Sequence, residues 1–296
     1  MKQEKARATR TRFSPVMAVM CVILCLYVLS LLIPFIWAFF TSFKSDIEFE
    51  ENVMGLPQKW VWNYGWVFTE FKKTIFTETG IKSVGIWAMF GNSLLYAMGS
   101  AFVASIVPCF TAYLCAQFKY KFSSIVYGIV VVTMVLPIVG NKPSQVDVAS
   151  KLHVLDTVYG LWLFNASFLG LYFLVFYNVF KALPRDFIEA AKIDGANNLR
   201  IFIRVILPVV RNTLLTIMLI KFIDFWNDYQ APLLLWQSSP TVAYGLYYMS
   251  TTSENGMNFA PKRMTASMIV FFPIMIIFIL LQKRLLGNLM VGGIKG

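Results

Sequence analysis

The stretch "EAAKIDGANNLRIFIRVILP", residues Glu189–Pro208, interrupts a very apolar chain with charged side chains and a central glycine. Asp186 and Glu189 stand at the spacing of a capping box, which predicts that a short helix begins near Asp186. Gly195 can adopt the left-handed backbone that commonly ends a helix. The pattern therefore predicts a short helix followed by a sharp turn.

A second short helix is expected directly after this turn. Asn197 or Asn198 can cap it, since an asparagine side chain accepts a hydrogen bond from a free N–H at a helix start. The second helix is expected to end before Pro208, because proline disfavours the helical conformation of the residue before it. On geometry alone two interpretations stay open: the segment packs on its own bundle, or it docks into another protein.

The composition indicates a membrane protein. Of the 296 residues, 58% are hydrophobic and only 14% are charged, whereas soluble domains carry about 25% charged residues. Several separate apolar runs reach the length of a spanning helix. The net charge of +11 does not indicate a nucleic-acid partner, because the basic residues lie between apolar runs, as the positive-inside rule requires.

The apolar runs predict an all-α, polytopic membrane protein with six transmembrane helices in a lipid bilayer. Their expected positions are roughly 15–42, 86–116, 124–141, 160–181, 212–235 and 264–286. The first run is too long for a signal peptide, so we expect an uncleaved helix. The expected organisation is a tail, first helix and external segment over 1–85, a core over 86–286 with a cytoplasmic loop at about 182–211, and a tail over 287–296.

The distribution of charge predicts the orientation of the chain. If the amino end is cytoplasmic, the internal segments are 1–14, 117–123, 182–211 and 283–296. These segments hold most of the basic residues and only four acidic residues, which are Glu4, Asp186, Glu189 and Asp194. An excess of Lys and Arg marks the cytoplasmic side. Both termini and the loop at 182–211 are therefore expected in the cytoplasm.

The external segment contains the aromatic stretch "LPQKWVWNYGWVFTEF". Its aromatic residues are Trp60, Trp62, Tyr64, Trp66, Phe68 and Phe71. Aromatic side chains at this density suit the bilayer interface, where the ring lies among headgroups and its polar atom stays hydrated. Contact with an external partner is the alternative interpretation.

No catalytic constellation is visible, and we expect neither enzymatic activity nor a cofactor or metal bound by this chain. There is no Walker A sequence, so the chain cannot itself hold the phosphates of ATP. The cysteines lie in apolar runs, where cysteine serves as a small hydrophobe, and we expect no disulfides. The single histidine, His153, is expected to be structural or solvated.

Ionisable residues inside the fifth apolar run are the candidates for a translocation path. Lys221, Asp224 and Asp228 share one helical face, and Asn227 lies beside them. Charged groups at membrane depth usually face a bundle interior or a water-filled cavity. A Lys221–Asp224 pair that neutralises itself and supports packing is the alternative. We favour the path, because Asn227 and Asp228 exceed what one lysine needs.

The opening segment resembles the cytoplasmic signature of ATP-binding-cassette importer permeases: EAA, three residues, Gly, nine residues, Ile, any residue and Leu-Pro. The residues that match at this spacing are Glu189, Ala190, Ala191, Gly195, Leu207 and Pro208, and Val205 replaces the isoleucine. Over roughly residues 84–296, stretches such as "GNSLLYA", "FIDFWNDYQAPLLLW" and "MVGGIKG" are similar to the carbohydrate-uptake branch. They most resemble the six-span permease of the maltose-transporter type.

The resemblance implies a role for the EAA segment as a coupling helix that docks into a cleft on an ATPase. Carried over, Glu189 pairs with a basic group of the ATPase, and Ala190 and Ala191 let the helix sit deep in the cleft. Asp194 and Gly195 belong to the same coupling segment. The implied partners are a second homologous permease subunit, two ATPase subunits that hold ATP and Mg, and an extracellular solute-binding protein.

The resemblance implies a permease subunit for a carbohydrate, an oligosaccharide or a related solute, located in the bacterial cytoplasmic membrane. A permease for amino acids or peptides is the alternative within transport, since its coupling segment is similar. A membrane-embedded enzyme or scaffold is the alternative outside transport. An enzyme of that kind needs a polar catalytic loop with paired acids or a metal site, and the sequence shows none.

Overall fold

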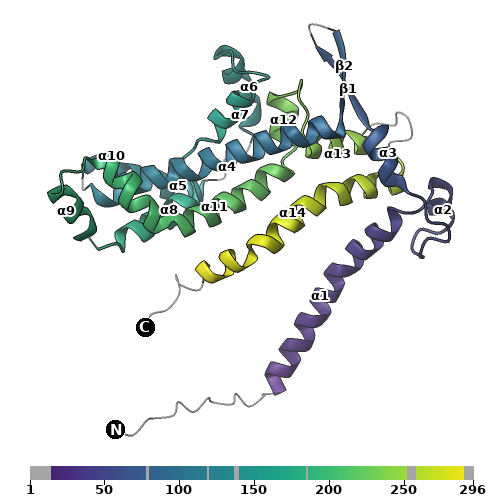
Figure 1. Ribbon diagram of the computed structural model, residues 1–296, viewed down its shortest axis with the longest axis horizontal. Helices are drawn as coiled ribbons and strands as arrows, with labels where there is room; N and C mark the ends of the chain where they lie inside the picture. Colours follow the sequence, from purple (N-terminus) through teal and green to yellow (C-terminus); the bar gives the residue numbers. More distant parts are fainter. Residues whose placement is uncertain are drawn as a thin grey trace.

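The computed structural model describes residues 15–77, 80–118, 120–136, 140–184, 186–251 and 258–289. Within these ranges the chain is helical apart from one hairpin (Figure 1). Its long helices are α1 (Pro15–Thr41), α4 (Ile86–Gln117), α11 (Leu207–Asn227) and α14 (Ala260–Leu289). The prediction of a predominantly α-helical fold is confirmed.

The shorter helices connect or flank the long ones. Before α4 lie α2 (Asp46–Glu51) and α3 (Asn63–Thr69). Between α4 and α11 lie α5 (Lys121–Val135), α6 (Lys142–Lys151), α7 (Val158–Asn165), α8 (Leu171–Lys181), α9 (Asp186–Ile193), α10 (Asn198–Ile201) and the π-helical turn η1 (Phe202–Ile206). Between α11 and α14 lie α12 (Gln230–Leu235) and α13 (Val242–Thr251).

One antiparallel hairpin departs from the all-α prediction. Its strands are β1 (Lys72–Thr77) and β2 (Gly80–Gly85), and Lys72 lies opposite Gly85 in the register. The hairpin projects from the end of the molecule at which α4 begins (Figure 1). It belongs to the segment between the first and second apolar helices, where the sequence predicts an external polar region.

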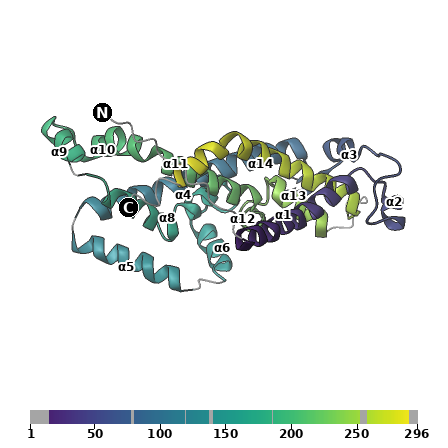
Figure 2. The ribbon, with the colours of Figure 1, turned by 90° about the horizontal axis from the view of Figure 1, so that it is seen from below.

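Helix α4 forms the centre of the bundle and packs against α7, α8 and α11. Figure 1 shows α9 and α10 at one end of this bundle, and α2, α3 and the hairpin at the other. Turned by 90°, the ribbon shows α5 standing off from the rest of the bundle (Figure 2). The coupling segment (residues 182–211) and the polar segment after α1 therefore lie at opposite ends of the molecule.

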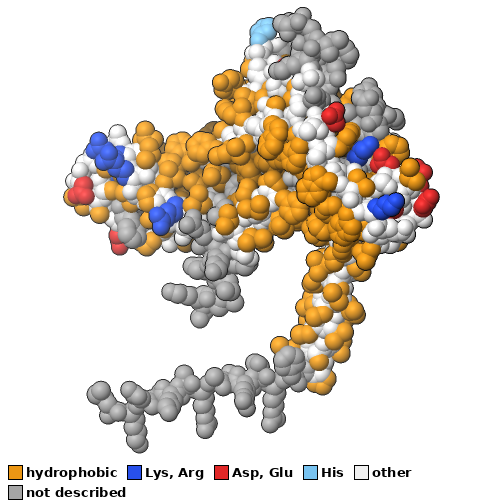
Figure 3. Space-filling view, turned by 45° about the vertical axis from the view of Figure 1, so that its right-hand side comes forward, with side chains coloured by type: hydrophobic (Ala, Val, Ile, Leu, Met, Phe, Trp, Pro, Cys, Tyr) orange, Lys and Arg blue, Asp and Glu red, His pale blue; other side chains and the backbone are white. Residues whose placement is uncertain are grey.

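Charged side chains gather at these two ends. In the space-filling view, Lys, Arg, Asp and Glu lie at the left and right ends, and the surface between them is predominantly hydrophobic (Figure 3). A hydrophobic belt between two charged ends is the surface expected of a chain that crosses a bilayer.

Within the described residues, four helical stretches are long and apolar enough to cross a membrane. They are Pro15–Thr41, Ile86–Gln117, Asn198–Asn227 and Ala260–Leu280. The apolar helices α5 and α8 are shorter, at about 22 and 16 Å for a rise of about 1.5 Å per residue, against a hydrocarbon thickness of about 30 Å. The multi-pass prediction agrees with these helices, but six full-length spans are not confirmed.

The run predicted as one span at 160–181 is two helices. Gly170 adopts φ +111° between α7 and α8, a conformation that cannot continue a right-handed helix. Helix α7 packs against α4 and α12, and Trp162 lies so close to Gly99 of α4 that a Cβ at residue 99 would meet the indole ring. The apolar composition predicted one spanning helix here, and it did not distinguish one helix from two.

The expected end of the second short helix before Pro208 is wrong. The helix that starts at Asn198 continues through η1 into α11, which has Pro208 in its first turn. A proline ring collides with the carbonyl four residues earlier in a regular helix. The wider π-helical turn at Phe202–Ile206, directly before the proline, lets the chain pass this point without ending.

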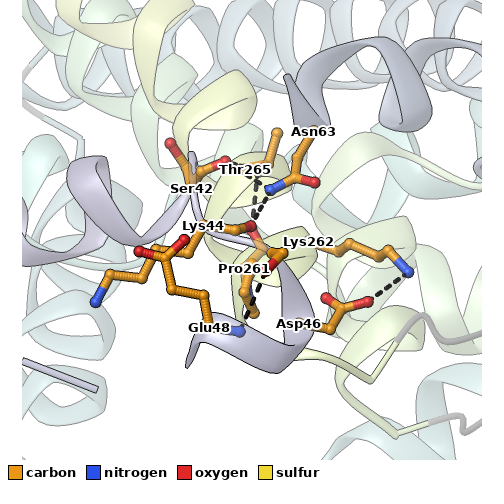
Figure 4. A network of polar contacts seen from close by, with 9 residues as sticks. Ser42, Lys44, Asp46, Glu48, Asn63, Pro261, Lys262 and Thr265 are labelled. Carbon is orange, nitrogen blue, oxygen red and sulfur yellow. Dashed lines mark hydrogen bonds and ion pairs between the residues drawn. The ribbon is translucent and has the colours of Figure 1, made fainter. Parts of the chain in front are cut away.

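Helix α1 is held at its carboxy-terminal end. Within the helix only Thr41 is buried. Beyond it, the buried amide Nδ2 of Asn63 donates to the carbonyl oxygens of Ser42 at 2.9 Å and Lys44 at 2.7 Å. Thr265 Oγ1 of α14 also donates to the Ser42 carbonyl, at 3.0 Å (Figure 4). We call Ser42, Lys44, Asn63 and Thr265 the α1 clamp.

The Lys44 side chain extends the α1 clamp. It is fully buried, and its Nζ donates to the carbonyl oxygens of Asn52 at 2.5 Å and Val53 at 3.3 Å. Nearby, Lys262 of α14 and Asp46 of α2 form an ion pair at 3.1 Å (Figure 4). Buried polar groups that all find partners fix one geometry, so the clamp sets the direction in which α1 leaves the bundle.

Candidate functional site: the coupling segment and the end of helix α11

The EAA residues lie on α9, which ends in a Schellman motif. Gly195 has φ +74°, so the predicted left-handed stop is confirmed. The Ala196 N–H donates to the Ala191 carbonyl at 3.0 Å, and the Gly195 N–H donates to the Lys192 carbonyl at 3.0 Å. These two bonds satisfy carbonyls that the helix end would leave without partners, and they make the turn after α9 rigid.

The start of α9 differs slightly from the capping-box prediction. The helix includes Asp186 as its first residue, so its N-cap is residue 185, which lies outside the described residues. Asp186 and Glu189 both lie in the first turn. Acidic side chains there interact favourably with the positive end of the helix dipole, so they stabilise the helix start without the predicted cap.

The two alanines of the EAA sequence face different surroundings. Glu189 and Ala190 are exposed. Ala191 is half-buried against a group of buried, largely aromatic side chains beneath α9, which we call the aromatic cluster. Ile188 is also buried, and it attaches α9 to the bundle. The outward face of α9 therefore includes Glu189 and Ala190, and the small side chain at Ala191 brings α9 close to its own bundle.

Two exposed apolar residues of this end were not among the sequence-based candidates. Ile193 at the end of α9 is 87% exposed, and Leu199 in α10 is 58% exposed. The buried centre of a protein interface is more apolar than the rest of a protein surface, so these two side chains are candidates for contact with a partner. A signal existed in the sequence: both residues lie in a polar stretch, where no apolar face of a span requires them.

The rest of the coupling segment connects α9 to the bundle. Asn197 caps α10, and its Oδ1 accepts from the Arg200 N–H at 2.8 Å, so the choice between Asn197 and Asn198 is resolved. Leu207 is half-buried, and Pro208 is exposed at the start of α11. Because α10, η1 and α11 follow one another without a break, a displacement at α9 can be transmitted along α11.

The far end of α11 carries the ionisable residues predicted for the path. Lys221 Nζ lies 3.2 Å from Asp224 Oδ2, which confirms that the two side chains pair. The lysine Nζ also lies 4.8 Å from the ring centroid of Tyr172. Asp224 and Asn227 are exposed, and Asn227 Nδ2 donates to the Ile223 carbonyl at 2.9 Å. The pair is only partly shielded, with 53% of the Asp224 side chain exposed.

Asp228 is half-buried, and both of its carboxylate oxygens have partners within the chain. Its Oδ2 accepts from the Tyr96 hydroxyl at 2.7 Å, and its Oδ1 accepts from the N–H groups of Gln230 at 2.9 Å and Ala231 at 3.3 Å. The carboxylate therefore caps α12 and fixes α12 to α4. Its backbone has ψ +115°, so α11 ends at Asn227 and the span predicted at 212–235 is broken there.

An apolar cavity of about 830 Å³ lies beside α11 and opens between α4 and α11. Its lining includes Leu94, Met98 and Phe102 of α4, Leu215, Leu219 and Phe222 of α11, and Trp162 of α7. Asn212 and Thr216 contribute the polar side chains of this lining. An apolar cavity open to the side of a bundle is a surface that a further apolar helix can fill.

The described residues contain no group of three or more His, Cys, Asp and Glu that could hold a metal ion. His153 lies in the turn after α6 with φ +55°, distant from both α9 and the end of α11 along the chain. The candidate site comprises an exposed helix, α9, before α10, and ionisable side chains where α11 ends.

Proteins that resemble this chain were found by sequence and by structure. The probable starch degradation products transport system permease protein AmyC of Thermoanaerobacterium thermosulfurigenes is 29% identical, over 88% of this chain and 91% of that protein. The diacetylchitobiose uptake system permease protein NgcG of Streptomyces coelicolor is 24% identical, over 97% of this chain and 92% of that protein. The sn-glycerol-3-phosphate transport system permease protein UgpE of Salmonella choleraesuis is 29% identical, over 73% and 78%.

A solved structure with the same fold is described as a bacterial ABC transporter involved in the import of the acidic polysaccharide alginate. The match has a TM-score of 0.72 and 23% sequence identity, and it covers 95% of this chain and 99% of the other. The family match extends over residues 108–289, which is more than half of the chain and includes the coupling segment and α11. The chain therefore belongs to the family of binding-protein-dependent transport system inner membrane components.

Proposed function

We propose that this chain is one permease subunit of an ATP-driven importer and forms half of its translocation path. The observation that carries the proposal is the continuity of α10, η1 and α11. This continuous element joins the exposed EAA helix at one end of the bundle to the charged helix break at Lys221, Asp224 and Asn227 at the other. A movement of α9 caused by an ATPase can thus be transmitted through this element to the residues proposed for the translocation path.

A second permease subunit is proposed as the direct partner in the membrane. The most apolar stretch of α1 has no buried residue within this chain, and the cavity between α4 and α11 is open to the side. Lipid covers a smooth apolar helix surface equally well, so it is the cavity that indicates a protein partner, because a packed helix fills it more closely than mobile acyl chains do. Helix association in lipid relies on close packing, which a homologous bundle of similar length can provide.

Two ATPase subunits, which hold ATP and Mg, are proposed as the partners of the coupling segment and its counterpart on the second permease. Glu189 is exposed with no ion pair among the described residues, so it is available to a basic group of the ATPase. This assignment places α9 and both termini in the cytoplasm. The opposite end, with α2, α3 and the hairpin, then faces the solute-binding protein.

The proposed substrate class is a carbohydrate, an oligosaccharide or a related solute. Three relatives are named for starch degradation products, diacetylchitobiose and sn-glycerol-3-phosphate. These compounds share several hydroxyl groups and differ in charge. The exposed Asp224 and Asn227 side chains offer hydrogen-bond acceptors and donors that suit hydroxyl groups.

The transporter reconstituted in proteoliposomes, with its second permease, ATPases and binding protein, is expected to hydrolyse ATP faster when the binding protein carries an oligosaccharide. The measurement is ATP hydrolysis and solute uptake against panels of oligosaccharides, polyol phosphates, amino acids and peptides. Stimulation by amino acids or peptides alone would contradict the proposed substrate class. The absence of ATPase co-purification would contradict the role as a permease.

Asp224→Asn is expected to lower uptake by about tenfold and leave the complex assembled, because it leaves Lys221 without its counter-charge in the path. Asp147→Asn is the matched control. Asp147 also pairs with a lysine, Lys151 at 2.7 Å, but it is 61% exposed on α6, away from α11. The measurement is initial uptake rate per assembled complex. Equal rates in both variants would assign the Lys221–Asp224 pair to packing.

A further inference from the structure

A second cavity, of about 740 Å³, lies at the end of the bundle that carries α9. It is formed where α4 ends, α5 begins and α8 ends. Gln117 of α4 closes one side, because its Nε2 donates to the Phe180 carbonyl of α8 at 3.0 Å. Helices α9, α10 and α11 do not line this cavity, and Leu183, which precedes α9, is the only residue of the coupling segment in its lining.

The cavity is cationic. Lys121 of α5 and Lys181 of α8 both line it, both are exposed, and no acidic side chain is among the lining residues. In the part of the chain that the structure describes, neither lysine forms an ion pair. Lys181 Nζ lies 5.9 Å from the ring centroid of Tyr177, so its ammonium group lies over an aromatic ring. Two positive charges therefore face one cavity without a negative partner.

Hydrogen-bond donors surround these charges. The hydroxyl groups of Ser123, Ser124 and Tyr127 line the cavity. Ser123 Oγ donates its hydrogen to the Phe118 carbonyl at 2.7 Å, so the hydroxyls that can donate to an anion are those of Ser124 and Tyr127. No side chain caps the start of α5. Free N–H groups at a helix start attract negative charge. The lysines, hydroxyls and helix start together favour an anion with several oxygen acceptors.

Part of the remaining wall of the cavity is apolar. Ala116, Phe180 and Leu183 contribute to this part, and Cys115 and Tyr120 also line the cavity. On α5, which starts at the cavity, Ile125 is 56% and Val132 is 55% exposed. Helix α5 is apolar and stands off from the bundle (Figure 2). An anion-binding end continuous with an exposed apolar helix matches a molecule with an anionic head and an acyl chain.

We propose that this cavity binds the phosphate headgroup of an anionic phospholipid, with an acyl chain along α5. Basic pockets between membrane helices on the cytoplasmic side are suited to such headgroups. The assignment to the cytoplasmic leaflet rests on the orientation proposed above. Lipid binding itself does not depend on that orientation, because it requires only the lysines, the hydroxyls and insertion of the chain in a membrane.

The test uses the complete transporter complex in detergent, with phosphatidylglycerol and phosphatidylcholine as probes and native mass spectrometry as the measurement. The unsubstituted complex is expected to retain phosphatidylglycerol in preference to phosphatidylcholine. The double variant Lys121→Gln, Lys181→Gln is expected to bind phosphatidylglycerol about tenfold more weakly, since each basic residue near an anionic surface contributes to binding. The double arginine variant keeps both charges and is expected to retain the lipid.

Lys151→Gln is the matched control, because Lys151 is 73% exposed and paired with Asp147 on α6. Unchanged phosphatidylglycerol binding in the double glutamine variant, or an equal loss in Lys151→Gln, would overturn the proposal. Displacement of the lipid by an equal concentration of inorganic phosphate would also overturn it, by showing a site for free anions. ATP hydrolysis stimulated by oligosaccharide is measured separately, so failure of the lipid site and failure of the transport function are distinguishable.

Discussion

Ala190→Trp is expected to abolish retention of the ATPase by the permease and to uncouple ATP hydrolysis from uptake. Ala190 is exposed on α9, next to the exposed Glu189 and one turn from the exposed Ile193. An indole at this position prevents α9 from entering a cleft shaped for a methyl group. A loss of about 1.4 kcal/mol already weakens binding about tenfold, and residues at interface centres commonly contribute 2 kcal/mol or more.

The fold of the permease is expected to survive this substitution, because the methyl group of Ala190 makes no buried contact within the chain. Ala182→Trp is the matched control. Ala182 is also exposed at this end, but it follows α8 and lies outside the EAA sequence. The measurements are co-purification of the ATPase and substrate-stimulated ATP hydrolysis in proteoliposomes. If Ala190→Trp retains the ATPase as well as Ala182→Trp does, α9 is a surface turn and not a coupling helix.

The turn after α9 offers a second variant of the same test. Gly195 has φ +74°, and no atom lies close to the position of a Cβ at this residue. Gly195→Val therefore introduces backbone strain of about 1–2 kcal/mol without a steric collision. The variant is expected to reorient α9 and lower co-purification of the ATPase, whereas α4 and α11 remain in the membrane.

Asn63→Asp is expected to destabilise the protein and release α1 from its fixed direction. Asn63 is 7% exposed, and its amide donates to the Ser42 and Lys44 carbonyls. A carboxylate has no donor for these oxygens and places a negative charge beside them. Each buried polar group left without a partner costs about 1–3 kcal/mol, and a buried charge costs more.

Two measurements test this variant. Thermal unfolding in detergent reports the stability, and cross-linking of cysteines at residues 35 and 271 reports the position of α1, in a background without the native cysteines. Phe35 and Phe271 have ring centroids 4.9 Å apart, so a short bismaleimide should join the two positions in the parent chain and not in the variant. Asn141→Asp is the control, because Asn141 is exposed and its side chain caps no helix. Parent-like unfolding and cross-linking in Asn63→Asp would show that the clamp does not hold α1.

Local patterns predicted the parts of the fold that depend on neighbours in the sequence. The stop at Gly195 and the pairing of Lys221 with Asp224 follow from conformational freedom and helical spacing, and the structure confirms both. The boundaries of α1 and α4 agree closely with the predicted runs at 15–42 and 86–116. A long apolar run in a bilayer favours one conformation, a continuous α-helix. Lipid offers no hydrogen-bond partners, so the backbone groups must bond to one another within the helix.

The EAA spacing also came from the sequence alone, and with it the family. The signature specifies residues at fixed separations, so it can be read without coordinates. Which of its residues face outward cannot be read in this way. Ala190 and Ala191 are identical side chains, and only the packing of Ile188 and Ala191 onto the aromatic cluster shows that Ala190 faces outward.

Tertiary structure alone decided the features that depend on residues far apart in the sequence. Asp228 looked free because its neighbours offer no obvious partner, but it accepts from Tyr96, 132 residues away. The breaks at Gly170 and Asp228 turn two apolar runs into four helices, and this lets α7 pack against α4 and α12 pack against α6 and α7. Periodicity and composition describe what a segment can bury. The partner that buries it, and therefore the role of its polar groups, is fixed only when the chain has folded.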